Sequence, residues 1–366
     1  MAKRLEGLPN HTSVHAAGVV IYPGVASDYV PLGRASDGTP TAEYNMIQLE
    51  ELGLLKMDFL GLRTLTVIKD AVKNIKASRG IDVDIDHIDF NDKGTLDFIG
   101  SGRTEGVFQL ESAGMQNFMK ELKPQNFEDI VAGISLYRPG PMDFIPNYIK
   151  GKNNRDTITY VTPELEPILE PTYGCIVYQE QVMQIVRDLA GYTLGRSDLL
   201  RRAMSKKKED EMLKLKTQYL EGARAKGYDT QKADELFELI MKFAEYGFNK
   251  SHSAAYGLVC FQTAYLKTYY PAEFMAALIT SESGNIDKVV KYKEEINRMG
   301  YTMLAPNINK SYKDFATTKD ADGKQAIIYG LAAIKGLGEG VIDSIVAERE
   351  SRGEFKNFQD FVERNE

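Results

Sequence analysis

The sequence predicts a mixed fold that is predominantly α-helical, in which a small β-sheet near the N-terminus precedes a large, mostly helical region. The stretch 55–59 alternates apolar residues with a cation and a carboxylate, which is the two-residue period of a strand. Just after Gly61 the apolar residues change to helical spacing, and this spacing prevails beyond Gly94. We therefore expect two structurally different regions.

The predicted strand has one apolar and one polar face. We expect Leu55, Met57 and Phe59 to be buried, while Lys56 and Asp58 share the opposite face. Two interpretations stay open here. The pair is either a surface ion pair on a half-buried edge strand, or a carboxylate placed at a strand end for chemistry.

Length and composition exclude several classes of protein. The 366 residues suffice for two or three cores, because domains typically hold ~100 to 200 residues. The chain is 43% hydrophobic and 27% charged, as is typical of soluble proteins, and no apolar run approaches the ~18 residues of a membrane span. The N-terminus lacks the apolar core of a secretory signal peptide, so we expect a cytoplasmic protein without membrane partners.

The numbers of cysteines and charged residues exclude further kinds of binding site. Only Cys175 and Cys260 occur, each in an apolar stretch, which excludes a disulfide framework and a cysteine-based zinc site and predicts two reduced core residues. The net charge of −7 argues against a protein that coats nucleic acid over its whole surface. Any site for a polyanion must be local.

Near the N-terminus, the stretches 18–22 and 28–32 are predicted to form two short strands joined by a turn, and the strand with Asp58 should join their sheet. His15 precedes the first strand and is interpreted as a structural histidine. A helix should follow from Leu62 to about Lys76.

Three carboxylates then alternate along a turn-rich segment, at Asp82, Asp84 and Asp86. Such a pattern resembles a metal site, but alternating aspartates on a short exposed edge are commonly solvated, and we favour the solvated interpretation. Further on, helical spacing predicts a buried core face, which consists of Leu110, Met115, Met119 and Leu122.

The middle of the chain offers a rigid turn, a polar loop and a helix start. Two prolines in 137–141 make the turn stiff and hold Arg138 firmly. A polar loop is expected over 150–156, and 178–181 should open a helix that runs to Gly191.

Six cations oppose the single Asp198 in the stretch 196–208. They are Arg196, Arg201, Arg202, Lys206, Lys207 and Lys208. On a helix they form at least one basic stripe, so the stretch is either a local anion site or a solvated helix balanced by the acidic residues 209–211.

A segment near residue 250 has features of a phosphate-binding site. A helix should start at 249–251, capped by Asn249 or Ser251, so that Lys250 and His252 converge on its N-terminus; the alternative is a buried capping turn.

Near the C-terminus, 334–345 fits a hairpin between helices. Lys335, Gly336 and Gly338 would let its amides contact DNA phosphates, although the same turn also serves as a plain connector and Glu339 is unfavourable beside a phosphate.

Several of these segments, in this order, resemble one family over nearly the whole chain, namely the bacterial replicative DNA polymerase III alpha subunit of the C-family polymerases. The matching blocks are 15–20, 56–63, 108–112, 138–141, 178–183, 200–204 and 248–252. The resemblance implies template-directed transfer of a deoxynucleotide from dNTP to a primer 3′ hydroxyl, with two Mg²⁺ ions held by acidic side chains.

The resemblance also implies roles for individual residues. Asp58 matches the third of three catalytic, metal-binding aspartates, and Lys56 suits a phosphate contact. The resemblance also implies that residues of the fingers approach the incoming triphosphate. They are Arg201, Arg202, Lys206, Lys207, Lys208, Lys250, Ser251 and His252. Candidate contacts to primer-template DNA are Arg138, Lys335, Gly336 and Gly338.

The implied architecture is a partial β-sheet palm, nucleotidyltransferase-like, followed by large helical fingers. We expect the rear of the palm with the end of the thumb at 1–75, the fingers at 76–310 and a helix-hairpin-helix segment at 311–366. The partners implied for the parent protein are DNA, dNTP, the sliding clamp and the clamp loader.

One departure from the family pattern matters. The family's other two aspartates form an Asp-x-Asp pair upstream, and no such pair precedes Asp58, so we expect a fragment that is inactive alone. The competing interpretation is a non-catalytic DNA-binding or scaffolding module. A hydrolase that uses His15 or His252 lacks a partner nucleophile at a persuasive spacing.

Overall fold

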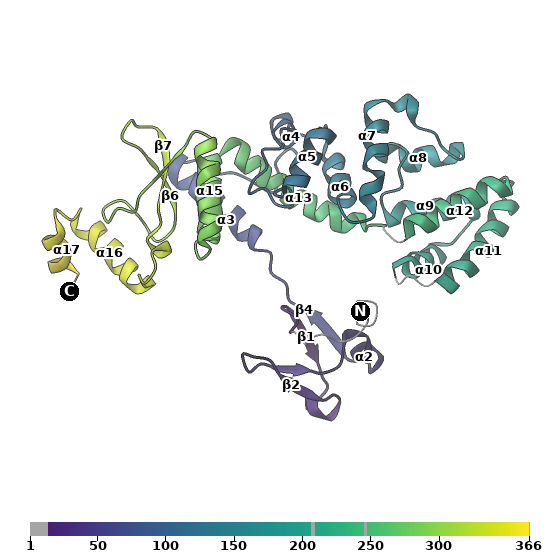
Figure 1. Cartoon of the computed structure of the whole chain (residues 1–366), viewed down its shortest axis with the longest axis horizontal. Coiled ribbons are helices and arrows are strands. Elements are labelled where there is room, and N and C mark those ends of the chain that lie inside the picture. Colours follow the sequence, from purple (N-terminus) through teal and green to yellow (C-terminus); the bar gives the residue numbers. More distant parts are fainter. Residues whose placement is uncertain (1–13, 206–208, 245–246, 366) are drawn as a thin grey trace, which may run out of the picture. The chain divides into compact units, whose positions relative to one another are not determined.

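The computed structural model describes residues 14–205, 209–244 and 247–365. The chain divides into two compact units, Met1–Arg63 and Thr64–Glu366. Most elements are helices, and the few strands form small sheets, which confirms the predicted mixed, predominantly α fold (Figure 1). Within the described ranges, no helix is both long and apolar enough to cross a membrane.

The N-terminal unit holds two separate antiparallel pairs of strands, β1 with β4 and β2 with β3. Their bounds, with those of the two short helices, are β1 (Gly18–Ile21), η1 (Ala26–Asp28), β2 (Leu32–Arg34), β3 (Pro40–Ala42), α2 (Met46–Glu51) and β4 (Leu55–Asp58). The expected pairing of the Asp58 strand with the first strand is confirmed.

The expected strand over 28–32 is wrong. The backbone N–H groups of Tyr29 and Val30 both donate to the carbonyl of Ala26, so this stretch makes local turn bonds instead of a ladder. The strand begins only at Leu32, and it pairs with β3 and not with β1.

The expected burial of the apolar face of β4 is also wrong. Leu55, Met57 and Phe59 are 59%, 41% and 65% exposed. The small core of this unit contains Val30, Leu49 and Leu54, and it packs against Val20, which stands opposite Lys56 in the register. Among the described residues, the packed layer lies behind the face of Val20 and Lys56, so this face is the inner one.

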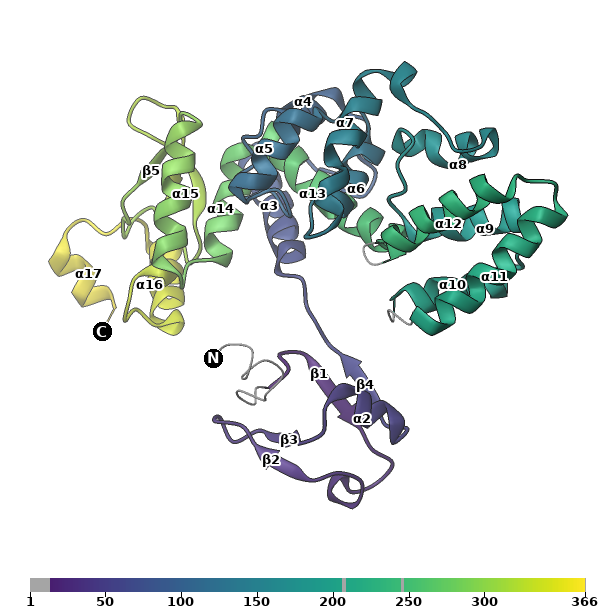
Figure 2. The ribbon, with the colours of Figure 1, turned by 45° about the vertical axis from the view of Figure 1, so that its right-hand side comes forward.

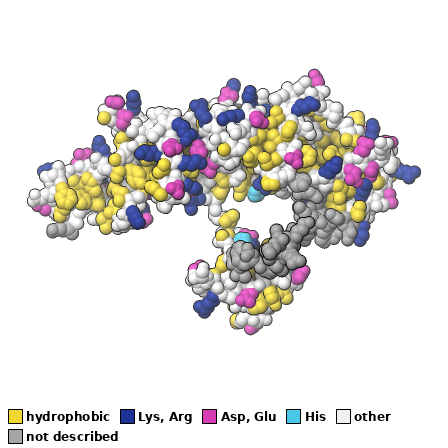
Figure 3. Space-filling model, in the orientation of Figure 1, with side chains coloured by type: hydrophobic (Ala, Val, Ile, Leu, Met, Phe, Trp, Pro, Cys, Tyr) yellow, Lys and Arg dark blue, Asp and Glu magenta, His cyan; other side chains and the backbone are white. Residues whose placement is uncertain are grey.

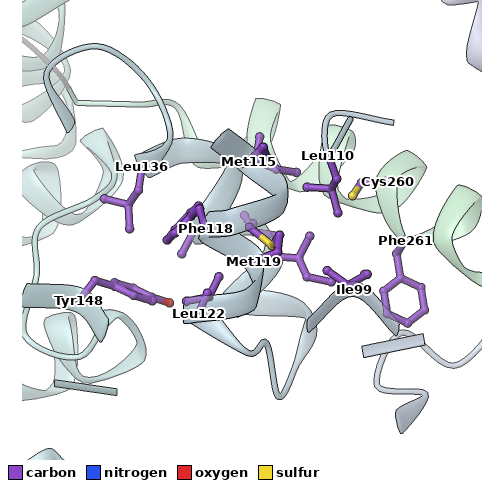
Figure 4. Packing of buried hydrophobic residues seen from close by; sticks show 14 of the residues in the cluster. Ile99, Leu110, Met115, Phe118, Met119, Leu122, Leu136, Tyr148, Cys260 and Phe261 are labelled. Carbon is purple, nitrogen blue, oxygen red and sulfur yellow. The ribbon is translucent and has the colours of Figure 1, made fainter. Parts of the chain in front are cut away.

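The large unit begins with a helical group that shares one core, drawn in Figure 4. Its elements are α4 (Lys93–Gly100), α5 (Ala113–Leu122), α6 (Phe127–Leu136), η2 (Pro141–Phe144), α7 (Ile145–Asn153), η3 (Arg155–Thr157) and, from much later in the sequence, α13 (Lys250–Tyr269). The helix α3 (Arg63–Arg79) comes just before α4 in the chain, and its buried residues are not part of this core. Met115, Met119 and Leu122 lie in this core as predicted. Leu110 is buried too, but it precedes α5, so its place in the helical pattern was wrong.

A second helical group has its own core. It consists of η4 (Pro163–Leu165), α8 (Glu166–Leu169), η5 (Glu170–Thr172), α9 (Gln179–Ala190), α10 (Leu194–Ser205), α11 (Glu209–Ala225) and α12 (Thr230–Ala244) (Figure 2). The predicted helix from 178–181 to Gly191 is confirmed as α9. The chain enters the α9–α12 helices at Tyr178 and leaves them at Phe248, where these two residues form a parallel bridge.

The C-terminal part of the large unit combines helices with a three-stranded sheet. Its elements are α14 (Pro271–Ser281), α15 (Ile286–Arg298), β5 (Thr302–Leu304), β6 (Ala316–Lys319), β7 (Gln325–Ile328), η6 (Leu331–Ala333), α16 (Glu339–Arg352) and α17 (Phe358–Arg364). β7 is central, parallel to β5 and antiparallel to β6. The turn predicted between two helices connects the one-turn η6 to α16, so the first of the two helices is short.

A buried ion pair explains another difference from the sequence prediction. The expected polar loop over 150–156 is helical as far as Asn153, because Lys152 turns inward and its ammonium lies 3.0 Å from Asp129. Both side chains are almost fully buried. Tyr148 and Tyr173 donate their hydroxyls to the same carboxylate, which joins α6, α7 and η5.

We predict that Asp129→Ala lowers the free energy of unfolding by about 3–5 kcal/mol, because Lys152 keeps its buried charge without a counter-ion. Urea denaturation measures the loss. The matched control is Asp97→Ala, which breaks the exposed pair with Lys93 and should cost no more than ~1 kcal/mol. Equal losses in the two variants would contradict the assigned role of the buried pair.

Candidate functional site

Asp58 stands at the end of β4 in a small polar cluster. Lys56 Nζ lies 2.7 Å from Asp58 Oδ1, and His15 Nδ1 lies 3.8 Å from the same oxygen. The amide N–H of Gly18 donates to His15 Nδ1 at 2.7 Å. A Cβ atom at Gly18 would lie 2.6 Å from Lys56 Cε and 2.9 Å from His15 Nδ1, so a larger residue here would displace the side chains of the cluster.

The cluster keeps Asp58 ionised and accessible. The hydrogen bond from Lys56 is the main cause that lowers the pKa of Asp58, with a smaller contribution from His15. The carboxylate side chain is 54% exposed, whereas that of Lys56 is 15% exposed. Asp58 therefore presents a charged oxygen pair that can bind a cation.

Asp58 fits a metal site as one ligand among several. Among the residues that the structure describes, no three His, Cys, Asp or Glu side chains gather into a group that could hold an ion. Mg²⁺ is commonly bound by one or two carboxylates together with water and substrate phosphates, so a single exposed aspartate is a partial site. A metal bound there would need its further ligands from other groups.

Two of the three alternating aspartates after α3 form ion pairs at the surface. Asp82 lies 2.8 Å from Lys76 Nζ, and Asp84 lies 2.8 Å from His87 Nδ1. All of these side chains are strongly exposed. The favoured interpretation of a solvated segment agrees with these positions.

The basic stretch forms the end of α10, where one carboxylate holds two arginines. Arg201 Nη2 lies 2.7 Å from Asp198 Oδ1, and Arg202 Nε lies 2.8 Å from Asp198 Oδ2. The hydrogen bond from Arg201 is the largest cause that lowers the pKa of Asp198. The three side chains carry a net positive charge. Lys206, Lys207 and Lys208 lie outside the described residues.

The predicted helix start at 249–251 is confirmed, with Asn249 as its cap. Asn249 Oδ1 accepts from the His252 amide at 2.9 Å. The amide N–H of Lys250 donates to both carboxylate oxygens of Glu180, at 3.1 and 3.0 Å, and Lys250 Nζ lies 2.9 Å from Glu128. The helix terminus thus already contacts an anionic group of the chain itself.

A row of side chains in ring contact begins at the turn after α6, and its Phe248 and His252 rings meet edge to face. The Arg138 guanidinium carbon lies 3.8 Å from the centre of the Phe248 ring. The ring centres of Phe248 and His252 are 5.4 Å apart, and those of His252 and Tyr256 are 4.4 Å apart and nearly parallel. Burial lowers the pKa of Arg138, which nevertheless stays charged. We name these four residues the cation–aromatic row.

Sequence reasoning missed this row as a unit. It assigned Arg138 to DNA contact and His252 to phosphate contact without bringing them together, and it gave Phe248 and Tyr256 no role. The spacing of 252 and 256 by four residues was the available signal, because such positions share one helix face. Phe248 lies just before the helix, outside this pattern.

The C-terminal turn presents an exposed cation beside a helix start. Gly336 has φ 88°, a left-handed conformation that glycine adopts without strain, and Gly338 immediately precedes α16 without a side-chain cap. Lys335 is exposed. Glu339, which the sequence marked as unfavourable, lies 2.8 Å from Lys313 Nζ, so its charge is locally balanced.

Profiles of known families match three parts of the chain. Residues 1–61 match the bacterial DNA polymerase III alpha NTPase domain, residues 64–242 match the finger domain of the same subunit, and residues 300–366 match a helix-hairpin-helix motif. These matches define a polymerase-type class of protein before any relative is considered.

The chain belongs to the family of bacterial DNA polymerase III alpha subunits. It is 50% identical to the DNA polymerase III subunit alpha of Campylobacter jejuni over 366 residues, 99% of this chain, and 47% identical to that of Thermus aquaticus over the whole chain. The subunit of Borreliella burgdorferi is 50% identical over 98% of this chain. The chain spans about 30% of the length of these curated relatives.

We predict that Lys56→Met raises the pKa of Asp58 toward the usual aspartate value of ~3.9, because the hydrogen bond from Lys56 is the main cause of its lowering. Carboxyl carbon NMR during a pH titration measures the change. Lys69→Met, which removes an exposed lysine from α3, is the control and should leave Asp58 unaffected. An unchanged titration in the Lys56 variant would refute the assigned cause.

Proposed function

We propose that this chain is part of a DNA polymerase that transfers deoxynucleotides from dNTP to the 3′ hydroxyl of a primer on a template. The observation that carries the proposal is the cation–aromatic row beside the start of α13. Ring faces stack on bases, and cations attract phosphates. The relatives that match along almost the entire chain bear the name DNA polymerase III subunit alpha.

The proposed triphosphate contacts are the cations of α10 and α13, with Ser251 and His252 at the helix start. Arg201 and Arg202 share Asp198, and Lys250 is held by Glu128. A triphosphate would compete with these carboxylates, because its charge is greater than that of either one. Lys206 and Lys207 belong to the same proposed set.

Metal ions complete the proposed chemistry. Two Mg²⁺ ions would activate the primer hydroxyl and stabilise the leaving pyrophosphate. Asp58 is the proposed ligand from this chain, and Lys56 keeps its carboxylate ionised before a cation arrives. Because two ions need more carboxylates than Asp58 supplies, we propose that the parent protein contributes the others and that this chain alone does not extend a primer.

The proposed domain functions are those that the sequence predicts. Residues 1–75 act as the rear of the palm with the end of the thumb, 76–310 as the fingers and 311–366 as a DNA-contacting segment. In that segment Lys335, Gly336 and Gly338 face DNA phosphates, and Arg138 adds a DNA contact through the row. Sliding clamp and clamp loader are proposed partners of the parent protein, which acts in the cytoplasm.

In the full-length polymerase, we expect Asp58→Asn to reduce the rate of nucleotide incorporation by orders of magnitude while primer-template binding persists, because a lost metal-ligand charge acts mainly on the transition state. Single-turnover extension and a DNA-binding titration separate the two effects. Asp28→Asn, at an exposed aspartate of the same unit, is the control. A near-normal rate in the Asp58 variant would remove this residue from the proposed site.

We expect Arg201→Ala in the full-length polymerase to raise the apparent KM for dNTP more than it changes DNA affinity. Arg224→Ala, at an exposed arginine of α11, is the control. If the chain is instead a DNA-binding module, Arg201→Ala leaves the KM unchanged, while Lys335→Glu weakens DNA binding and lowers its salt dependence by about one phosphate contact.

A further inference from the structure

We propose that a cavity between the two helical cores binds a small amphipathic anion, namely an apolar ring that carries one acidic group. The cavity has a volume of about 330 Å³, which is at the lower end of the range of small-molecule sites. It lies between α7, the segments 157–159 and 173–176, and α12. No residue of the cation–aromatic row lines it.

The walls have the composition that such a ligand requires. The apolar surface comes from both cores, with Phe144 and Ile158 from the first and Ile176 and Phe243 from the second. Neutral polar groups also line the cavity, namely Asn147, Thr157 and Thr159.

Lys150 gives the cavity its charge preference. It is the one charged residue of the lining, and no ion pair of Lys150 is found among the described residues. A ring would therefore bury its apolar surface against the core residues, while its acidic group pairs with the Lys150 ammonium.

Contacts of Tyr173 hold one wall of the cavity in place. Tyr173 has φ 52°, an unusual conformation for an aromatic residue, and its hydroxyl donates to the buried Asp129 at 3.0 Å. A Cβ atom at Gly151 would lie 2.6 Å from the Tyr173 carbonyl oxygen, so α7 and this segment are already in close contact. The buried ion pair of Asp129 and Lys152 thus holds one wall in place without a ligand.

Cys175 lines the cavity, so the reactivity of its thiol can report whether a ligand is bound. It is half-buried, and burial raises the pKa of its thiol to about 11. The other cysteine, Cys260, is fully buried in α13. Because the thiolate is the reactive form, alkylation of the native chain should be slow, should rise with pH toward 11, and should occur at Cys175.

The test uses anilinonaphthalene sulfonate, an aromatic ring system with one acidic group, on the folded chain. We expect saturable fluorescence enhancement and a matching decrease in the rate at which N-ethylmaleimide modifies Cys175 at pH 9, located by mass spectrometry. Lys150→Gln should weaken this binding about three- to tenfold and leave binding of the uncharged N-phenylnaphthylamine unchanged. Lys120→Gln, at an exposed lysine of α5, is the matched control.

A second variant tests the cavity independently of its charge. Leu239→Trp adds volume at a lining position whose side chain is already exposed, so it should abolish protection of Cys175 without unfolding the chain, as circular dichroism will show. Dye binding without protection of Cys175 would overturn the proposal. So would equal dye affinity of the Lys150 and Lys120 variants, or undiminished protection in the folded Leu239 variant.

Discussion

The cation–aromatic row depends on the point between the two helical cores where the segments before α9 and before α13 pair. The Gln179 amide donates to the Phe248 carbonyl at 3.0 Å, and the Phe248 amide donates to Val177 at 3.4 Å. Glu180, one residue after Gln179, accepts from the amide of Lys250, two residues after Phe248. Because the chain enters the α9–α12 helices and leaves them at this one point, the starts of α9 and α13 are held side by side. The stacking of Arg138 on Phe248 relies on that position.

The paired cations of the large unit fall into two groups, which differ in how deeply they are buried. Lys267 and Glu295 pair in the interior, where Lys267 also donates to backbone carbonyls, so this pair is fully satisfied and is suited to a structural role. Arg202 and Lys250 are held by carboxylates too, but at partly exposed positions where water and ligands can compete. Figure 3 shows cations and carboxylates close together on the described residues of one face.

The sequence alone determined the elements whose cause is local. The strand with Asp58 followed from alternation, the start of α13 from the short polar side chain of Asn249, and the end of α9 from Gly191, which has φ 67°. These signals are carried by neighbouring residues and need no knowledge of the remaining chain. The family likewise followed from blocks of sequence in a constant order, because each block is a local pattern.

Only the tertiary structure decided which faces are buried and which distant residues meet. The alternation around Met57 defined two faces, but the inner one is the face of Lys56, because the small core lies on that side. Arg138 and Phe248 are 110 positions apart in the sequence, and no periodicity links them. Glu180 reaches the start of α13 only because the pairing of the two segments brings it there. The reason is physical: propensity and caps act within a few residues, whereas burial and long-range stacking depend on packing that the whole chain creates.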